Sequence, residues 1–318
     1  MPASFIFNSE TFSWFMIFGK SVRILLLTAS AILSFVVADN VVNAVMMKGI
    51  DNYYGLSGNP EILLVGHSHL MLAVDKERLE RETDMKVSKY CREGVNVSDK
   101  KAMVEHFLSS GHADSLRYVL YGVDLATFTG EGLSQNSYTL FYPFIDEPSI
   151  DNYIRSQASF SDYWLHKLIK TSRFSDDGIK NSAVRGWLDN WSNLKGNTID
   201  VETYRQRLAN GDERHIHMNP SLIRQFDETV KMITARGVKV ILVNTPTFYL
   251  LNDFEPEKYA AIMHWFEFYA LKDPLVEFWD FNPAYASDFT IFSDRLHLNR
   301  KGQQIITGEL IERIKLDK

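Results

Sequence analysis

The pattern of apolar positions along the chain predicts five strands that are buried in a sheet. Four of these segments are short and mainly apolar, as expected of strands covered on both faces of a parallel sheet, and the second alternates apolar with polar residues. A glycine or an asparagine follows each of the first four within three residues and marks a turn. The five segments are residues 62–65, 85–91, 116–121, 238–243 and 276–281.

Segments with helical spacing of apolar residues lie between these strands. One predicted helix starts at Asp75. Four more cover residues 98–108, 219–237, 255–270 and 299–314. Asp75, Ser98 and Asn219 are placed to cap three of them. Strands that alternate with helices require a parallel sheet with right-handed crossovers. We therefore predict a doubly wound α/β/α sandwich of three layers, with a flavodoxin-like parallel sheet.

Residues 125–218 break this alternation. The segment is rich in aromatic residues and has no clean strand period. We predict an insertion of short helices and loops, because loops of this length inside a compact domain are usually lids or binding elements. A plain helical subdomain that packs its own aromatic side chains is the alternative.

The first fifty residues contain a segment that fits a membrane. Residues 24–38 form an uncharged apolar run, and the apolar surface continues to residue 47. A spanning helix needs about 20 apolar residues. Lys20 and Arg23 precede the run, so the positive-inside rule places the amino terminus in the cytoplasm and the rest of the chain outside. We therefore predict a membrane anchor through residues 24–47.

Two other interpretations of this segment stay open, a cleaved signal peptide with its cleavage site at 36–38 and a buried core helix. The long, aromatic-rich stretch before the apolar run favours an anchor at a membrane interface. The predicted organisation is a cytoplasmic stub and anchor at 1–50, a connector at 40–60 and an extracytoplasmic domain at 51–318. The protein is then a single-pass protein of a bacterial inner membrane, with its domain in the periplasm.

Composition excludes several kinds of protein. The 318 residues are 45% hydrophobic and 23% charged, which is ordinary for a folded protein with a full core. The formal net charge of -6 gives no electrostatic footprint for nucleic acid. Cys91 is the single cysteine, so the chain forms no intrachain disulfide and no thiolate metal cluster.

Ser68 and two residues near the end of the chain are the strongest candidates for catalysis. Ser68 follows the first strand, at the edge where an open α/β sheet presents groups to a crevice. Asp294 and His297 lie between the fifth strand and the last helix, and so at the same edge. A serine nucleophile needs a base, and the base needs a carboxylate that fixes its tautomer. The sequence therefore predicts a triad of Ser68, His297 and Asp294.

These motifs together resemble the SGNH (GDSL-type) hydrolase superfamily. The shared features are a Gly-x-Ser turn after the first strand, a glycine after the second, Gly-x-Asp after the third and D-x-x-H before the last helix. The resemblance implies that Ser68 is the nucleophile and donates its own backbone N–H to the oxyanion. It also implies that Gly94 is a second backbone donor, Asp294 the orienting acid and His297 the general base.

The third oxyanion donor of the superfamily is usually an asparagine, and this chain has Asp124 at that position. A carboxylate cannot donate a hydrogen bond unless it is protonated. Asn96 and Asn244, both predicted near the crevice, are the alternative donors. Asp124 is otherwise expected to be a helix cap or a structural acid that binds backbone N–H groups.

The single anchor followed by an SGNH-like domain is similar to the D-alanyl transfer proteins of teichoic acid synthesis and to the alginate O-acetyltransferase group. This resemblance implies an acyl-Ser68 intermediate, an envelope polysaccharide as acceptor and a membrane-bound O-acyltransferase as partner. Two alternatives stay open: a glycan O-acetyl esterase that uses the same triad, and a non-catalytic scaffold that stacks a glycan on the aromatic insertion.

Two His-x-His pairs raise the question of a metal site, His67 with His69 and His215 with His217. Alternate residues of a strand place both imidazoles on one face. His67 and His69 are predicted in a turn, however, and no acidic cluster completes a ligand shell. We therefore expect no metal and no cofactor, with His67 and His69 as polar residues that line the crevice.

Overall fold

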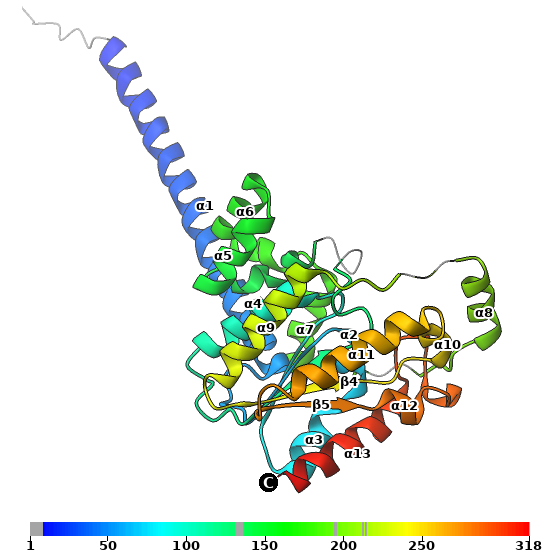
Figure 1. Ribbon diagram of the computed structural model, residues 1–318. Helices are drawn as coiled ribbons and strands as arrows, with labels where there is room; N and C mark the ends of the chain where they lie inside the picture. Colours follow the sequence, from blue (N-terminus) through cyan, green and yellow to red (C-terminus); the bar gives the residue numbers. More distant parts are fainter. Residues whose placement is uncertain (1–8, 131–135, 194–195, 212, 214, 318) are drawn as a thin grey trace, which may run out of the picture.

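A five-stranded sheet forms the centre of the molecule. The computed structural model describes residues 9–130, 136–193, 196–211, 213 and 215–317, with the backbone alone for 9–19. All neighbouring strands are parallel, in the order β2-β1-β3-β4-β5 (Figure 1). The strands are β1 (Ile62–Gly66), β2 (Val87–Cys91), β3 (Tyr118–Val123), β4 (Lys239–Asn244) and β5 (Val276–Asp280).

This sheet confirms the predicted α/β class and the parallel arrangement of the strands. Leu64 of β1 pairs with Leu120 of β3, and both side chains are fully buried, as their apolar pattern predicts. The strand order is that of flavodoxin-like sheets. In this order the chain passes from β1 to β2 at one edge of the sheet. It then returns to β3, which lies on the other side of β1. A crevice therefore opens between the carboxyl ends of β1 and β3.

Helices cover both faces of the sheet, with α4, α9 and α11 on one face and α3 and α13 on the other (Figure 1). The helices of this part are α2 (Ser68–Ala73), α3 (Lys76–Thr83), α4 (Val97–Ser109), α9 (Pro220–Thr234), α11 (Pro256–Ala270) and α13 (Arg300–Leu316). Asp75 and Asn219 cap α3 and α9 as predicted. The prediction of Ser98 as the cap of α4 is wrong, because the cap is Asn96, two residues earlier, which forms a capping box with Asp99.

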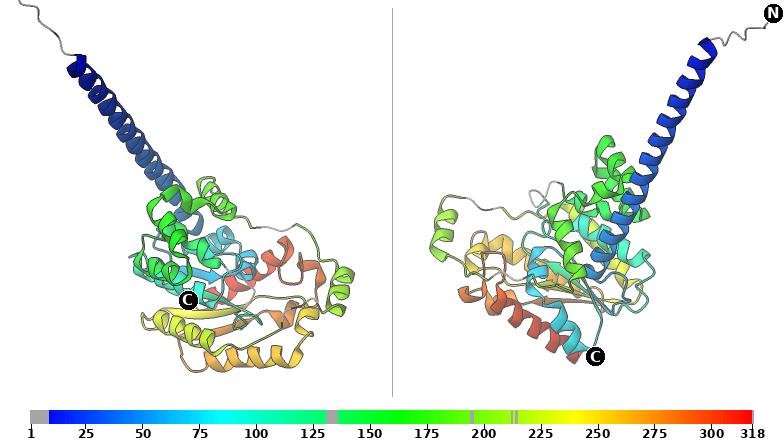
Figure 2. Two further views of the ribbon diagram at one scale, coloured as in Figure 1. Left: turned by 90° about the horizontal axis from the view of Figure 1, so that it is seen from above. Right: turned by 180° about the vertical axis from the view of Figure 1, so that it is seen from behind.

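The amino-terminal helix α1 (Ser9–Tyr54) projects from the body as one continuous rod (Figure 2). Its segment Lys20–Tyr54 is long and apolar enough to cross a membrane. The apolar side chains of residues 24–45 in this helix are mostly exposed to solvent. The predicted connector at 40–60 is wrong for most of its length, because the helix continues to Tyr54 and only residues 55–61 link it to β1.

The base of α1 packs backbone to backbone against α7 (Asp177–Trp187). A Cβ atom on Gly49 would lie 2.2 Å from the carbonyl oxygen of Ala183, and one on Gly186 would lie 1.8 Å from that of Gly49. Only glycine permits so close an approach. The indole N–H of Trp187 also donates to the carbonyl of Val45 at 3.0 Å. These contacts explain why the helix does not end where its apolar run ends.

The segment 125–218 contains several short helices, and its described residues form no strand. These helices are η1 (Ser137–Phe144), α5 (Pro148–Gln157), α6 (Phe160–Leu168), η2 (Lys170–Phe174), α7 and α8 (Val201–Ala209). Both η2 and α7 contact α1. Three further short elements follow β4 and β5, namely α10 (Tyr249–Asn252), α12 (Asn282–Tyr285) and η3 (Phe289–Ile291).

Candidate active site

Ser68 lies at the crevice between β1 and β3, as the first residue of α2. Two glycines allow α2 to sit close to the sheet edge. A Cβ atom on Gly66 would lie 2.9 Å from the Cβ of Leu70, and one on Gly122 would lie 3.1 Å from the same atom. Side chains at either position would push α2 outwards and move Ser68 with it. The glycines at the end of β1 and within β3 therefore position the serine.

Hydrogen bonds connect Ser68, His297 and Asp294 in one chain. The Ser68 Oγ lies 2.8 Å from the Nε2 of His297, and the Nδ1 of His297 lies 2.8 Å from the Oδ2 of Asp294. The side chain of His297 is 17% exposed and that of Asp294 is 42% exposed. A carboxylate on Nδ1 fixes the imidazole tautomer that leaves Nε2 free to accept the serine proton. The geometry is that of a nucleophile, a base and an orienting acid.

The loop that carries Asp294 and His297 is held at both ends. Phe292 and Leu298 form an antiparallel bridge across it, and the N–H of Ser293 donates to the carbonyl of His297 at 2.8 Å. Asp294 Oδ1 accepts the N–H of His297 at 3.0 Å, so the acid also shapes the loop that presents the base. The spacing of three residues thus places both side chains on one face of a closed turn.

A cavity of about 590 Å³ opens at Ser68. This is within the range of small-molecule sites. Gly94 lines the cavity together with Ser68 and His297, and its φ of 72° is a conformation that favours glycine. Gly211, Glu213 and His215 also line it, so the end of the 125–218 segment forms part of the wall.

Asp124 is 2% exposed and binds both histidines that flank Ser68. Its Oδ2 lies 3.0 Å from the Nε2 of His67 and 2.9 Å from the Nδ1 of His69. Its Oδ1 accepts the N–H of Ala126 at 2.9 Å. Burial opposes the charge of Asp124, but the two imidazoles hold its pKa well below the usual range. Asp124 is therefore an acceptor, and it takes the role of a structural acid instead of donating to an oxyanion.

Burial lowers the pKa of His67 to about 4, against the opposite effect of Asp124, so His67 is neutral at pH 7. Its Nδ1 accepts the N–H of His69 at 3.2 Å, which places its single proton on Nε2, towards Asp124. His67, His69 and Asp124 each offer one atom at metal-ligand spacing. A metal at this cluster would have to displace the proton from the Nε2 of His67. The contacts among His67, His69 and Asp124 explain why these three side chains lie together.

The two asparagines considered as oxyanion donors are engaged elsewhere, and neither lines the cavity at Ser68. Asn96 caps α4, with its Oδ1 bound to the N–H of Asp99 at 3.0 Å. Asn244 donates from Nδ2 to the Oδ1 of Asp280 at 2.8 Å. Of the predicted site residues, the structure brings together Ser68, Gly94, Asp294 and His297. Asp124 joins them at the cavity as an acceptor.

The second histidine pair does not converge on one point. His215 lies 3.0 Å from the Oε1 of Glu255 and is mostly exposed, whereas the N–H of His217 donates to Thr129.

Sequence reasoning missed Arg295, which lines the cavity with its Nε 2.6 Å from the Oε1 of Glu213. The sequence does contain a signal for Arg295, because it lies between Asp294 and His297, and a side chain so close to His297 is expected near the nucleophile.

Comparisons with known proteins give no family for the chain. No family model and no curated protein matches it. Among solved structures, it is similar to the crystal structure of the lipase Lip_vut3 from a goat rumen metagenome, with 10% identity and a TM-score of 0.37. The match covers 78% of this chain and 94% of the lipase. A likeness of this extent carries no argument about fold or function.

Proposed function

We propose that the protein transfers an acyl group through Ser68 to a hydroxyl group of an extracytoplasmic polysaccharide. The observation that supports this proposal is the hydrogen-bonded chain from Ser68 Oγ through His297 to Asp294, with both links at 2.8 Å. A serine with such a base and acid is the arrangement that acyl transfer requires. The cavity at Ser68 leaves room for an acyl group and part of an acceptor.

In the first half of the reaction, the Ser68 Oγ attacks the carbonyl carbon of an ester or thioester donor while its proton moves to the Nε2 of His297. The donor's alcohol or thiol leaves with that proton, and an acyl ester remains on Ser68. In the second half, a sugar hydroxyl gives its proton to His297 and attacks the acyl carbon. Ser68 leaves as the alcohol and recovers the proton, so the enzyme is restored.

The backbone N–H groups of Ser68 and Gly94 are the proposed oxyanion donors. Ser68 is the first residue of α2, and the N–H of a first helical residue has no partner within its helix. Gly94 lines the same cavity from the turn after β2. Two backbone donors without a third side chain give a weaker oxyanion hole than three. Asp124 serves only to fix the segment that carries Ser68, through His67 and His69.

Transfer is preferred to hydrolysis because α1 would keep the site beside a membrane that supplies the acyl group. The base of α1 packs against α7, so a membrane around α1 would lie at a fixed distance from Ser68. A membrane-bound O-acyltransferase is the proposed partner that delivers the acyl group. This choice of partner and the glycan acceptor follow from the resemblance to anchored SGNH proteins. The periplasmic orientation follows from Lys20 and Arg23, which precede the apolar run.

Two variants test the proposal in cells that produce the protein. Ser68→Ala and His297→Ala should each abolish O-acylation of the envelope polysaccharide while the protein remains present in membranes. His215→Ala is the matched control, since His215 lines the same cavity but lies outside the hydrogen-bonded chain. If both triad variants leave acylation intact, the proposed enzyme activity is wrong and a glycan-binding scaffold is favoured.

A glycan O-acetyl esterase is the second candidate, because the same triad would cleave an acyl ester if water replaced the sugar in the second half. The two are distinguished by the direction of change. Loss of Ser68 lowers the acyl content of the polysaccharide if the protein is a transferase, and raises it if the protein is an esterase.

A further inference from the structure

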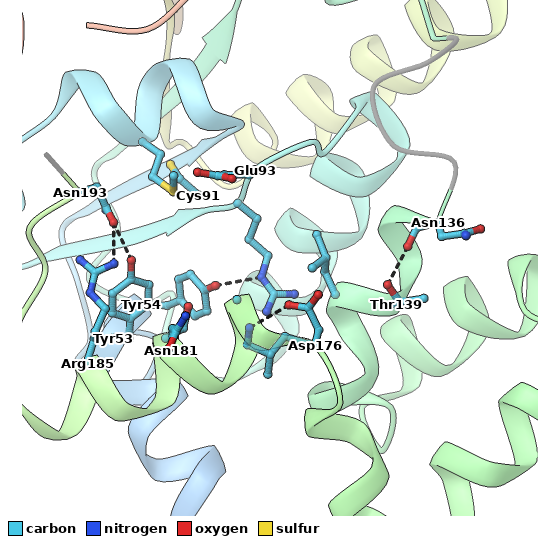
Figure 3. A pocket seen from close by; sticks show the side chains of 16 residues that line it. Tyr53, Tyr54, Cys91, Glu93, Asn136, Thr139, Asp176, Asn181, Arg185 and Asn193 are labelled. Atoms are coloured by element: carbon cyan, nitrogen blue, oxygen red, sulfur yellow. Dashed lines mark hydrogen bonds between the residues drawn. The ribbon is translucent and has the colours of Figure 1, made fainter. Parts of the chain in front are cut away.

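A second cavity, of about 570 Å³, opens where the end of α1, the end of β2 and the start of α7 meet (Figure 3). It is a neighbour of the active site. Glu93 lines this cavity, and the next residue, Gly94, lines the cavity at Ser68. Met71, which lies in the same short helix as Ser68, also lines it. One turn after β2 therefore separates the two cavities.

Arg92 forms part of the wall of this second cavity and is only 4% exposed. Its Nε donates to the hydroxyl of Tyr54 at 2.9 Å, which Figure 3 shows as a dashed line from the labelled Tyr54. The rings of Tyr54 and Phe141 lie 5.3 Å and 5.6 Å from its Cζ. The Nη1 of Arg92 is buried and has no hydrogen-bond partner among the residues that the structure describes. No carboxylate of the described residues lies within ion-pair distance of this guanidinium.

The absence of a carboxylate partner for Arg92 among the described residues is unusual, because a buried charge without a counter-charge is strongly unfavourable. Arg173, which is 1% exposed, shows how the same chain normally buries a guanidinium: its Nη1 lies 2.7 Å from the Oδ2 of Asp146 and its Nη2 3.2 Å from the Oδ1. Asp99 interacts electrostatically with Arg92, but its oxygens accept from the hydroxyl of Tyr153 and the N–H of Asn96. Arg92 therefore lacks the anion that Arg173 has.

The other charged side chains of the cavity wall are Arg185, Glu93 and Asp176. Arg185 binds only neutral oxygen atoms, among them the Oδ1 of Asn193 at 2.9 Å. Glu93 and Asp176, the two carboxylates of the wall, are exposed. Arg92 carries one positive charge, so one negative charge compensates it at the buried end of the cavity, and a second would meet the carboxylates of the rim. The cavity thus favours a monoanion such as a carboxylate.

Neutral hydrogen-bonding groups make up much of the remaining wall. Asn181 and Ser182 of α7 and Thr139 of η1 line the cavity, and Tyr53 contributes an aromatic ring beside them. Amides and hydroxyls can each donate and accept, which suits a ligand with several hydroxyl groups. A guanidinium presents two parallel N–H groups that match the geometry of a carboxylate. Together these groups fit a sugar that carries a carboxylate.

We propose that this cavity binds an acidic sugar residue, with its carboxylate on Arg92. This inference rests on the proposed function for one point, that the bound sugar belongs to the polysaccharide that receives the acyl group. The turn of Glu93 and Gly94 would then place the neighbouring sugar of the same polymer at Ser68. The site is a specificity site for an anionic acceptor, and Arg92 takes no part in the acyl chemistry.

Three monosaccharides that differ at carbon 6 test the proposal: glucuronate, glucose and glucose 6-phosphate. Their dissociation constants are measured by ligand-observed NMR with the full chain in detergent micelles. Glucuronate should bind about tenfold or more tightly than glucose, because it adds a charge-assisted hydrogen bond in a buried site. Equal binding of glucuronate and glucose would overturn the proposal. Tighter binding of glucose 6-phosphate than of glucuronate would overturn the choice of a carboxylate.

Two variants in the cavity and one outside it extend the test. Arg92→Gln should reduce glucuronate binding to the level of glucose, whereas Arg236→Gln removes the same charge from an exposed site outside the cavity and should change nothing. Glu93→Gln removes a rim charge without disturbing any hydrogen bond of the described structure and should tighten glucuronate binding about twofold. Unchanged binding in both cavity variants would contradict the site.

The variant Ser68→Ala tests the sugar site independently of the proposed acyl transfer. It should bind glucuronate as the unmodified protein does, although it transfers no acyl group. If the acyl transfer fails to appear in any experiment while Arg92 still governs glucuronate binding, the sugar site stands without the enzyme. If glucuronate binding depends on Ser68 and not on Arg92, the second cavity is not the sugar site.

Discussion

Two carboxylates bind histidines at the same edge of the sheet, on either side of Ser68. Asp294 binds His297 in a loop where its side chain is 42% exposed, and His297 in turn contacts Ser68. Asp124 is 2% exposed and binds His67 and His69 through one oxygen. The residue types are the same in both places. Their environments differ. Asp294 and His297 are accessible and contact a nucleophile, whereas Asp124, His67 and His69 are buried.

This difference shows how a fold assigns separate tasks to identical side chains. A general base must exchange its proton with a reacting group, and therefore needs access to the cavity. A structural pair must keep its charge and hydrogen bonds fixed, and burial with complete pairing achieves this. His297 meets the first requirement, and the cluster of Asp124 with His67 and His69 meets the second. Substitutions in the two groups should therefore have different consequences.

The largest effect is expected for His297→Ala. Cleavage of p-nitrophenyl acetate by the purified full chain should fall by about 10³-fold or more, because the serine loses its base. The melting temperature should change little, since His297 is partly exposed. His215→Ala, at the wall of the same cavity, should keep its activity. A loss of less than tenfold in His297→Ala would contradict the role of this histidine as the base.

A smaller loss of activity is expected for Asp294→Asn. The amide no longer stabilises the imidazolium, and the rate should fall by about 10²- to 10³-fold, less than for a fully buried acid because water reaches this one. Asp288→Asn is the control, because Asp288 lies in the same segment but binds Thr290 and Lys301. Equal losses in both variants would mean that the loop, and not the acid, carries the effect.

The buried cluster should instead appear in the pH dependence of stability. The pKa of His67 is lowered to about 4 in the folded protein, below the value of an unfolded chain, so the unfolded state binds more protons between these two values. Stability is complete above about pH 6.5 and falls by about 3 kcal/mol as the pH drops towards 4. Thermal unfolding across this range should show that loss, and His67→Gln should reduce it. A flat profile in the unmodified protein would contradict a neutral, buried His67.

The smallest of these effects is expected for Asp124→Asn. The amide keeps one acceptor for the histidines but loses the charge, so the free energy of unfolding should fall by about 2 kcal/mol. The folded fraction should retain ester cleavage within about tenfold of the unmodified rate. A loss of activity as large as that of His297→Ala, without a loss of stability, would contradict the structural role of Asp124.

Much of the fold and of the candidate site could be predicted because the information is local. Each strand is a short run with its own pattern, and Ser68, Asp294 and His297 each follow a strand, so the parallel topology places them at one edge. The spacing of Asp294 and His297 also lies within a single turn. Local patterns of this kind do not depend on what the rest of the chain does.

Other features depend on contacts between distant segments and could not be predicted in this way. The helix α1 continues to Tyr54 because Gly49 meets Gly186, and nothing near Gly49 in the sequence indicates that partner. The sequence places Asp124 where an asparagine donor is usual, but its role follows from His67 and His69, which come directly after β1 and lie beside it. Likewise, Arg92 resembles any surface arginine until its burial without an anion is seen.

The most direct test of the central claim is labelling of the full chain in membranes with a fluorophosphonate, followed by mass spectrometry of the peptide that contains Ser68. The unmodified protein and Asp124→Asn should carry the label on Ser68, whereas Ser68→Ala should carry none and His297→Ala should react far more slowly. Equal labelling of the unmodified protein and Ser68→Ala, or no labelling of the unmodified protein, would contradict a nucleophile activated by His297 and Asp294.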